Sequence, residues 1–296
     1  MSLAIKKVLV TASNGQVGYL LSQKLKKLKE EFEVYSFDRA SLDITCQVAV
    51  AEKCIEIRPD IIINCAAHTS VDKAETDIEN SFVVNEYGPK YLAEQAIKYD
   101  ALLIHISTDY VFAGNKQEPY VETDKPDPQG IYGKSKLAGE QAIQNTSCKN
   151  VILRTAWVFG EHGHNFVKTM LKLGKTREEL DIIGDQFGGP TYAGDIADAA
   201  ISISKRYKNE EQSGVYHFSG YPHVSWYKFA KSIFDHAKQA KIPLVLKTLN
   251  KIPATDYHLP APRPANSRLD CSKLESAFDI KQSNWQLALN RIKEYE

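Results

Sequence analysis

Three side chains of this 296-residue sequence have the types and spacing needed for proton transfer: Thr108, Tyr132 and Lys136. Tyr132 and Lys136 stand four residues apart, so a helix would place the phenol and the ammonium on one face. A phenol with a pKa near 10 donates protons poorly at neutral pH, and a nearby cation favours its ionised form and lowers that pKa. Such a pair also arises by chance in many helices, so its meaning depends on its surroundings.

The surroundings favour a catalytic interpretation. Residues 101–106 are typical of a strand, and this strand would deliver Ser107 and Thr108 to its carboxyl edge. Ligands of open α/β sheets bind at that edge, where a hydroxyl can hold a substrate carbonyl beside the tyrosine. We therefore predict Tyr132, Lys136 and Thr108 as the catalytic residues.

A glycine-bearing turn near the N-terminus predicts a dinucleotide site. Residues 6–10 are typical of a strand, Gly15-Gln16-Val17-Gly18 follows, and residues 19–28 form an amphipathic helical pattern. Strand, glycine turn and helix is the context in which helix N-terminal amides bind a pyrophosphate. Ala12 replaces the first glycine of the fingerprint, so it must have a negative φ or tolerate strain. The alternative is a tight turn with no ligand.

The end of the second predicted strand carries two candidate cofactor contacts. Asp38 lies twenty residues after Gly18, a spacing that suits an acceptor for the adenosine ribose 2′-hydroxyl. Arg39 can instead bind a 2′-phosphate, or it is a solvated loop charge. The two residues together indicate relaxed choice between NADH and NADPH.

The elements that position these residues alternate between strand and helix over the first half of the chain. Further strands are predicted at 33–37, 60–64 and 151–154, with helices at 48–57 and 82–99. This alternation predicts an α/β fold with a doubly wound, Rossmann-like parallel sheet. A strand near 181–183 is predicted to continue that sheet.

The pattern changes after Arg154, where aromatic and turn residues indicate loops over a cleft. We predict that residues 1–155 mainly form the dinucleotide-binding domain. Residues 156–296 would mainly form a smaller substrate-binding region, with some segments returning to the sheet. Helices are predicted at 165–173, 193–207, 285–293 and from Ser225 to about 240. The proline-rich segment 253–264 should be irregular.

Small residues follow the buried strand at 60–64. Asn64 and Ala66 either admit a flat cofactor ring or pack in a crowded turn. His68 has no identifiable partner, and a satisfied structural histidine is favoured over a base. Asn85, in the predicted helix 82–99, can hydrogen-bond to a neighbouring active-site strand.

Composition excludes several classes of protein. The 37 basic and 37 acidic residues balance, so nothing favours charge-driven binding to nucleic acid or to a membrane surface. No apolar run approaches the ~20 residues that span a bilayer. The five scattered cysteines include no C-x-x-C, which favours a reduced, cytoplasmic protein without a zinc site or a disulfide framework. There is no room for a signal peptide before the first strand.

Several segments together carry a resemblance. They are the glycine turn 15–18, Leu42-Asp43-Ile44-Thr45, 64–69, Val71-Asp72-Lys73-Ala74-Glu75, 107–112, 132–136, 154–158 and Arg263-Pro264. The chain resembles the extended short-chain dehydrogenases/reductases and, more narrowly, the dTDP-4-dehydrorhamnose reductase family. The glycine turn and Tyr-x-x-x-Lys are generic to the superfamily, whereas the runs 71–75 and 107–112 are narrower signals.

The resemblance implies that NADPH or NADH reduces the C4 ketone of dTDP-4-dehydro-6-deoxy-L-mannose, the last step of dTDP-L-rhamnose synthesis. Tyr132 matches the proton donor, Lys136 the lysine that tunes it and holds the nicotinamide ribose, and Thr108 the hydroxyl on the ketone. Substrate contacts would also come from Asp109 and Trp157, with Arg263 as a candidate for a phosphate; Trp157 is otherwise a core residue and Arg263 an exposed charge. Matching cofactor positions are Gly15, Gln16, Val17, Asp38, Asp43, Ile44, Ala66, Ala67 and His68, beside the generic Gly18 and Arg39. A homodimer and a role for Mg²⁺ stay open, because no ligand cluster can be assigned.

Two rival functions remain at this point. A nucleotide-sugar dehydratase or epimerase shares the scaffold, but a dehydratase pattern places Asp-Glu after the threonine, where this chain has Asp109-Tyr110. A non-catalytic NADP-binding regulatory subunit, resembling the methionine adenosyltransferase β subunit, is the other. Ala12 and Ala113 depart from the family pattern without touching the proposed chemistry.

Overall fold

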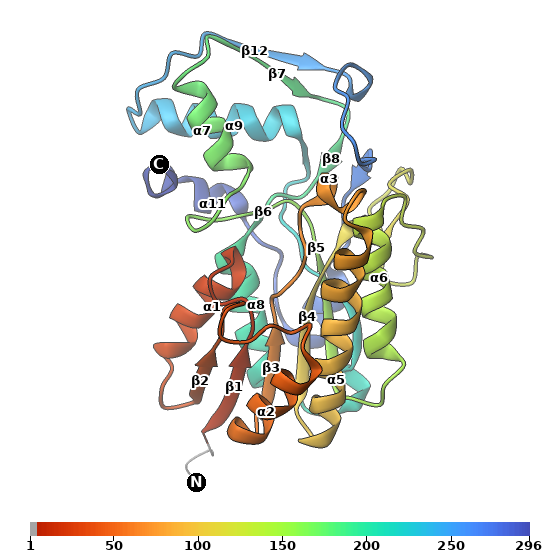
Figure 1. Ribbon diagram of the computed structural model, residues 1–296. Coiled ribbons are helices and arrows are strands. Elements are labelled where there is room, and N and C mark those ends of the chain that lie inside the picture. Colours follow the sequence, from red (N-terminus) through yellow and green to blue (C-terminus); the bar gives the residue numbers. More distant parts are fainter. Residues whose placement is uncertain (1–4) are drawn as a thin grey trace.

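The computed structural model describes residues 5–296 and is built on a six-stranded parallel sheet (Figure 1). The strand order β10-β5-β4-β3-β1-β2 confirms the predicted Rossmann-like α/β class. The strands are β1 (Lys6–Val10), β2 (Phe32–Ser36), β3 (Ile61–Asn64), β4 (Leu102–Thr108), β5 (Asn150–Thr155) and β10 (Gly214–His217). β3, β4 and β5 are almost wholly buried because helices cover both faces of the sheet.

Two helical layers cover the sheet. Side chains of α1 (Gln16–Lys26), α8 (Ala193–Arg206) and α10 (Ser272–Phe278) share one apolar core with Val8 and Val10. On the other face, α2 (Gln47–Ile57), α5 (Gly88–Lys98) and α6 (Ile131–Gln144) pack with Leu9 and Ile62. α8, α10 and β10 therefore return to the sheet from the second half of the sequence.

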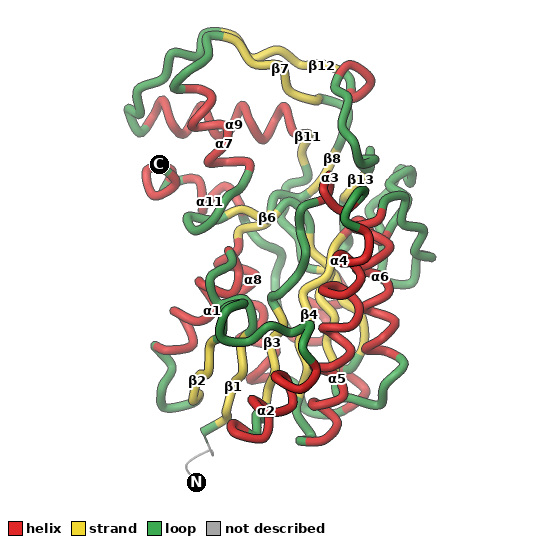
Figure 2. The backbone as a smooth tube through the Cα atoms, viewed as in Figure 1, coloured by secondary structure: helices red, strands yellow, loops and turns green. Residues whose placement is uncertain are grey.

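A smaller lobe lies beyond the carboxyl ends of the strands, at the top of Figure 1. Its core joins α7 (Phe166–Gly174), α9 (Trp226–Gln239) and α11 (Trp285–Leu289) with the turn Ile292–Tyr295. The paired strands outside the main sheet are β6 (Val158–Phe159) with β9 (Thr191–Tyr192), β7 (Glu179–Ile183) with β12 (Thr248–Ile252), and β8 (Phe187–Gly188) with β11 (Val224–Ser225) and β13 (Asn266–Ser267). Loops, green in Figure 2, link this lobe to the sheet.

The prediction that the strand near 181–183 continues the main sheet is wrong. β7 pairs in parallel with β12 in a separate two-stranded sheet. Its residues alternate between exposed and buried, as expected for a strand with one solvated face, whereas the main-sheet strands β3 to β5 are buried on both faces. The sixth position is filled by β10, which pairs with β5.

The predicted helix 82–99 begins earlier and is interrupted. It comprises α4 (Ile78–Phe82), a π-helical turn Val83–Tyr87 and α5, and it follows the short helix α3 (Val71–Ala74). Pro89 lacks the amide hydrogen that would bond to the carbonyl of Asn85, which explains the wider turn at this place. The remaining short helical turns are 3₁₀ segments at Asp109–Val111, Glu210–Gln212 and Ala254–Asp256.

Candidate active site

A cleft of about 730 Å³ lies at the carboxyl edge of the main sheet, and most of the predicted site residues line it. These are Gly15, Gln16, Val17, Gly18, Arg39, Asp43, Ile44, Ala66, Ala67, His68, Thr108, Asp109, Tyr132, Lys136 and Trp157. Asp38 and Arg263 are not among the lining residues. Thus residues from the loops after β1, β2 and β3, from β4, α1 and α6, and from the smaller lobe face one cavity, as the position of ligands in open α/β sheets requires.

The glycine turn after β1 fits a phosphate group. α1 begins at Gln16, so the amides of its first turn face the cleft without intrahelical partners. Gly18 packs so closely on the turn that an added Cβ would lie 2.2 Å from the Ala12 carbonyl oxygen. Ala12 has φ of 50°, so the turn accepts the strain that a missing glycine imposes. The predicted alternative of a negative φ at Ala12 does not occur.

Asp38 is turned into its own loop. Its Oδ1 accepts hydrogen bonds from the Ser41 amide at 2.9 Å and the Ser41 hydroxyl at 2.6 Å, and these bonds lower the pKa of the Asp38 carboxyl. Arg39 does reach the cleft, where its Nε lies 3.5 Å from Asp43 Oδ2. The structure therefore brings the cation of this pair, rather than the acid, to the cavity wall.

Tyr132 and Thr108 form the reactive end of the cleft. Thr108 is the last residue of β4, and its hydroxyl donates to Asp109 Oδ1 at 3.1 Å. Tyr132 lies in the first turn of α6, and its ring packs edge-on against Tyr110 with 5.4 Å between centroids. Burial raises the pKa of Tyr132 to about 12, which the neighbouring Thr108 hydroxyl opposes and the Asp109 charge reinforces. Burial likewise raises the pKa of Asp109 to about 6.

The predicted lowering of the Tyr132 pKa by Lys136 is wrong for this structure. The Lys136 Nζ donates to the Ile106 carbonyl at 2.7 Å and lies 3.2 Å from His105 Nε2, and burial dominates the phenol's titration. Tyr132 therefore holds its proton firmly at neutral pH until a ligand changes its surroundings.

Close backbone contacts fix α6 against the sheet. A Cβ at Gly133 would lie 2.2 Å from the Tyr110 carbonyl oxygen, and one at Gly139 would lie 2.0 Å from that of Asn85. No larger residue fits either position without moving the helix. These two glycines thus place Tyr132 beside Thr108.

A buried ion pair anchors the same helix. Glu140 and Arg154 are almost fully buried, and the Arg154 Nη2 donates to Glu140 Oε2 at 2.6 Å. The Ser107 hydroxyl donates to Glu140 Oε1 at 2.5 Å. Glu140 was not predicted from the sequence, although its position four residues after Lys136 and eight after Tyr132 places it on the same helical face.

The loop after β3 is fixed by hydrogen bonds from Asn85. Asn85 accepts a hydrogen bond from the His68 amide at 2.8 Å and donates to the His68 carbonyl at 3.1 Å. The His68 ring lies 3.2 Å from the Ser81 hydroxyl. These contacts support the interpretation of His68 as a structural histidine on the cleft wall. They also show that Asn85 hydrogen-bonds to the loop that follows β3.

The smaller lobe contributes Trp157 to the cleft. This residue has φ of 49° and stacks on Trp226, with 3.5 Å between centroids and 12° between planes. Gly188 leaves room for the indole, because a Cβ there would lie 2.5 Å from it. Arg263 instead pairs with Asp72 Oδ2 at 2.8 Å, outside the cleft wall.

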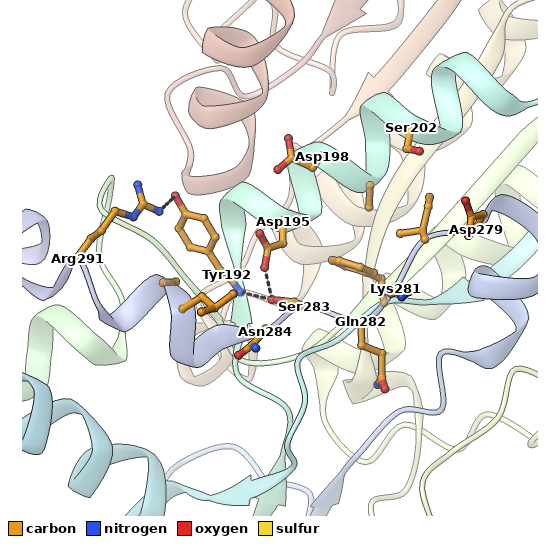
Figure 3. Close-up of a pocket in the computed structure, with 15 residues that line it drawn as sticks. Tyr192, Asp195, Asp198, Ser202, Asp279, Lys281, Gln282, Ser283, Asn284 and Arg291 are labelled. Atoms are coloured by element: carbon orange, nitrogen blue, oxygen red, sulfur yellow. Dashed lines mark hydrogen bonds between the residues drawn. The ribbon is translucent and has the colours of Figure 1, made fainter.

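A second cavity, of about 530 Å³, lies between α8 and residues 279–291 (Figure 3). Figure 3 shows two pairs of its polar side chains already hydrogen-bonded: Ser283 donates to Asp195 at 2.6 Å, and Arg291 donates to the Tyr192 hydroxyl at 2.8 Å. None of the predicted site residues lines it. Across residues 5–296 no group of three or more His, Cys, Asp or Glu side chains is placed to hold a metal ion. In the same range no helix is both long and apolar enough to cross a membrane.

A Rossmann-like sheet with a glycine turn, a strand-end threonine and a Tyr-x-x-x-Lys helix facing one cleft defines a short-chain dehydrogenase/reductase. Comparison with known proteins makes the assignment narrower. The family model described as the RmlD substrate binding domain matches residues 6–295, and the chain belongs to this family.

Several relatives of this chain are dTDP-4-dehydrorhamnose reductases. A dTDP-4-dehydrorhamnose reductase of Aggregatibacter actinomycetemcomitans is 46% identical over 98% of this chain and 99% of its own length. One from Escherichia coli strain K12 is 43% identical over 96% of each chain. The crystal structure of a dTDP-4-dehydrorhamnose reductase from Bacillus anthracis in complex with NADP has a TM-score of 0.89 and 38% identity, covering 98% of this chain and 99% of that one.

Proposed function

We propose that the chain reduces the C4 ketone of dTDP-4-dehydro-6-deoxy-L-mannose to give dTDP-L-rhamnose, with NADPH or NADH as the hydride donor. The observation that carries this proposal is the shared cleft, which Tyr132, Thr108 and Lys136 line together with the glycine turn. The substrate is inferred from the names of the relatives, which are dTDP-4-dehydrorhamnose reductases. The reduced nicotinamide would supply the hydride.

The chain's own residues would manage the proton and the developing charge. As C4 accepts the hydride, negative charge grows on the ketone oxygen, and donors placed there stabilise it. Thr108 would donate a hydrogen bond, and Tyr132 would transfer its proton to that oxygen. The high pKa of Tyr132 keeps this proton in place until the charge develops. A protonated Lys136 would then stabilise the phenolate.

The two lobes would divide the work. Residues 1–155 provide the glycine turn, Arg39 and Asp43 for the cofactor, and the Thr108–Tyr132 end of the cleft. Residues 156–296 provide Trp157, whose stacked ring would contact the substrate. We place this reaction in the cytoplasm, as expected for a nucleotide-sugar reductase.

The direct test follows oxidation of NADPH and NADH with enzymatically prepared dTDP-4-dehydro-L-rhamnose. Turnover with at least one cofactor, and formation of dTDP-L-rhamnose by mass and NMR, would support the function. A matched UDP-linked ketosugar serves as the control for the nucleotide. Cofactor binding without turnover on either sugar would contradict the proposal and favour a binding subunit.

Arg39 gives a prediction about cofactor choice. Because its guanidinium lies on the cleft wall next to Asp43, Arg39→Ala should raise KM for NADPH by about five- to tenfold, as the loss of an exposed charged contact to a 2′-phosphate does. KM for NADH should change less than about twofold. Lys205→Ala, which removes a surface cation outside the cleft, is the control. Equal effects on both cofactors would show that Arg39 does not read the 2′-phosphate.

A further inference from the structure

A buried chain of polar side chains runs behind the cleft and ends on Lys136. The Thr11 hydroxyl donates to Asn64 Oδ1 at 2.7 Å, and Asn64 Nδ2 lies 3.0 Å from His105 Nδ1. His105 Nε2 lies 3.2 Å from Lys136 Nζ. All four residues are at most 1% exposed, so no bulk water competes for these contacts. This series of side chains leads from the ends of β1 and β3, through His105 of β4, to Lys136 of α6.

A backbone amide fixes which atoms in this series of side chains donate hydrogen bonds and which accept them. The Ala66 amide donates to Asn64 Oδ1 at 3.0 Å, so the oxygen of the Asn64 side chain must face that amide. The Asn64 nitrogen, which can only donate, therefore faces His105 Nδ1. Because Nδ1 must accept, the proton of the neutral His105 ring is on Nε2.

That tautomer constrains Lys136. The Nε2–H of His105 points at Lys136 Nζ, which itself donates to the Ile106 carbonyl at 2.7 Å. An ammonium group has three donors and no lone pair, so it cannot accept from Nε2–H. A neutral amine can accept this bond and still donate to the carbonyl.

We propose that His105 is a positioning residue that holds Lys136 as a neutral amine in the free protein at mildly alkaline pH, so that cofactor binding takes up one proton. The proton comes from solvent and binds to the Nζ lone pair. Since an ammonium cannot accept from Nε2–H, protonation breaks the contact and releases Nζ from His105. No covalent bond between heavy atoms changes.

The charges around Lys136 agree with this. Burial lowers the pKa of Lys136 to about 8, while Glu140 on α6 and Cys65 in the loop after β3 oppose the shift. The Glu140 carboxylate is shared with Arg154 of β5, and Tyr132 keeps its proton. Burial holds the pKa of His105 well below its usual range, so its ring stays neutral.

The proton uptake rests on the proposed function. A nicotinamide dinucleotide carries a pyrophosphate dianion. This negative charge favours the ammonium form of Lys136 once the cofactor occupies the cleft. Binding should therefore weaken with rising pH wherever the free protein has lost this proton and the complex has kept it.

The first test reads the tautomer directly in the unmodified protein. Long-range ¹H–¹⁵N NMR correlations of the imidazole nitrogens at pH 9 should show His105 protonated on Nε2. His217 is an internal control, because its Nδ1 lies 3.1 Å from the Tyr120 carbonyl and must carry its proton there. A spectrum with His105 protonated on Nδ1, like His217, would overturn the proposal.

The second test measures Kd for NADH, which lacks a titrating 2′-phosphate, from pH 7 to pH 9. The pKa of Lys136 near 8 predicts that Kd rises about tenfold over this range, with uptake of close to one proton per NADH at pH 9 in calorimetry in buffers of different ionisation enthalpy. In His105→Gln the amide oxygen can accept from an ammonium, so the rise should be clearly smaller than in the unmodified protein, while burial of Lys136 still lowers its pKa. The matched control His217→Gln should keep the tenfold rise.

The outcomes separate this inference from the proposed function. A flat Kd profile with normal ketosugar turnover would overturn the inference and leave the reductase intact. An unchanged slope in His105→Gln would show that His105 does not set the charge of Lys136. Loss of NADH binding at every pH would count against the proposed function, and the NMR experiment would still decide the His105 tautomer.

Discussion

Tyr132→Phe should lower kcat by about 10²- to 10⁴-fold, the range lost when a positioned general acid is removed. The phenol lies at the reactive end of the cleft beside Thr108, and phenylalanine keeps the ring and its contact with Tyr110. KM for the cofactor should change little, because the substitution removes only the proton donor. Steady-state oxidation of NADPH at saturating ketosugar measures the effect.

Tyr110→Phe is the matched control for this prediction. Tyr110 lines the same cleft, packs edge-on against Tyr132, and has a phenol whose pKa burial raises. Its removal should change kcat by less than about fivefold if it is not the acid. A large loss in Tyr110→Phe with near-normal turnover in Tyr132→Phe would reverse the assignment of the two tyrosines.

Arg154→Met should lower the free energy of unfolding by about 3–5 kcal/mol, the cost of leaving a buried charge without its partner. Arg154 is 3% exposed and bonds to Glu140 through both Nε and Nη2, so its loss leaves the Glu140 carboxylate with only the Ser107 hydroxyl. Urea denaturation of the two proteins measures the difference.

Two further variants separate charge burial from lost packing. Adding Glu140→Leu and Ser107→Ala to Arg154→Met removes the orphaned groups, and at least half of the lost stability should return, since apolar replacement of a buried pair is often neutral. Lys205→Ala breaks an exposed pair with Glu31 and should cost at most about 1 kcal/mol. A loss in Arg154→Met as small as in Lys205→Ala would mean that solvent reaches Glu140.

Local patterns were sufficient to predict five strands of the main sheet, β1 to β5, and most of the cleft. β3 appears in the sequence as an apolar run, and the glycine turn stands between a strand and a helix, so chain order alone places both at one sheet edge. Thr108 and Tyr132 were found because each lies next to an element boundary. These features depend on neighbours in sequence.

The misplaced features depend on contacts between distant segments. Arg263 pairs with Asp72, 191 residues away, and no local sequence pattern predicts that partner. Asp38 is the exception, because its competing partner is local: it was predicted from its spacing, but the hydroxyl of Ser41 stands only three residues on. The role of His105 appears only when Asn64 and Lys136 meet it across two strands and a helix.

The return of α8 and β10 to the sheet has a consequence for synthesis of the protein. A chain leaving the ribosome presents its N-terminal segments first. α1 shares its apolar core with α8, and β5 pairs on its outer side with β10. The apolar face of α1 and the outer edge of β5 therefore stay uncovered until residues 193–217 have been synthesised. Until then the nascent chain carries an open strand edge and an uncovered apolar face, which are features that chaperones protect. Slow translation between Thr155 and Ala193 would lengthen this exposed interval and increase aggregation.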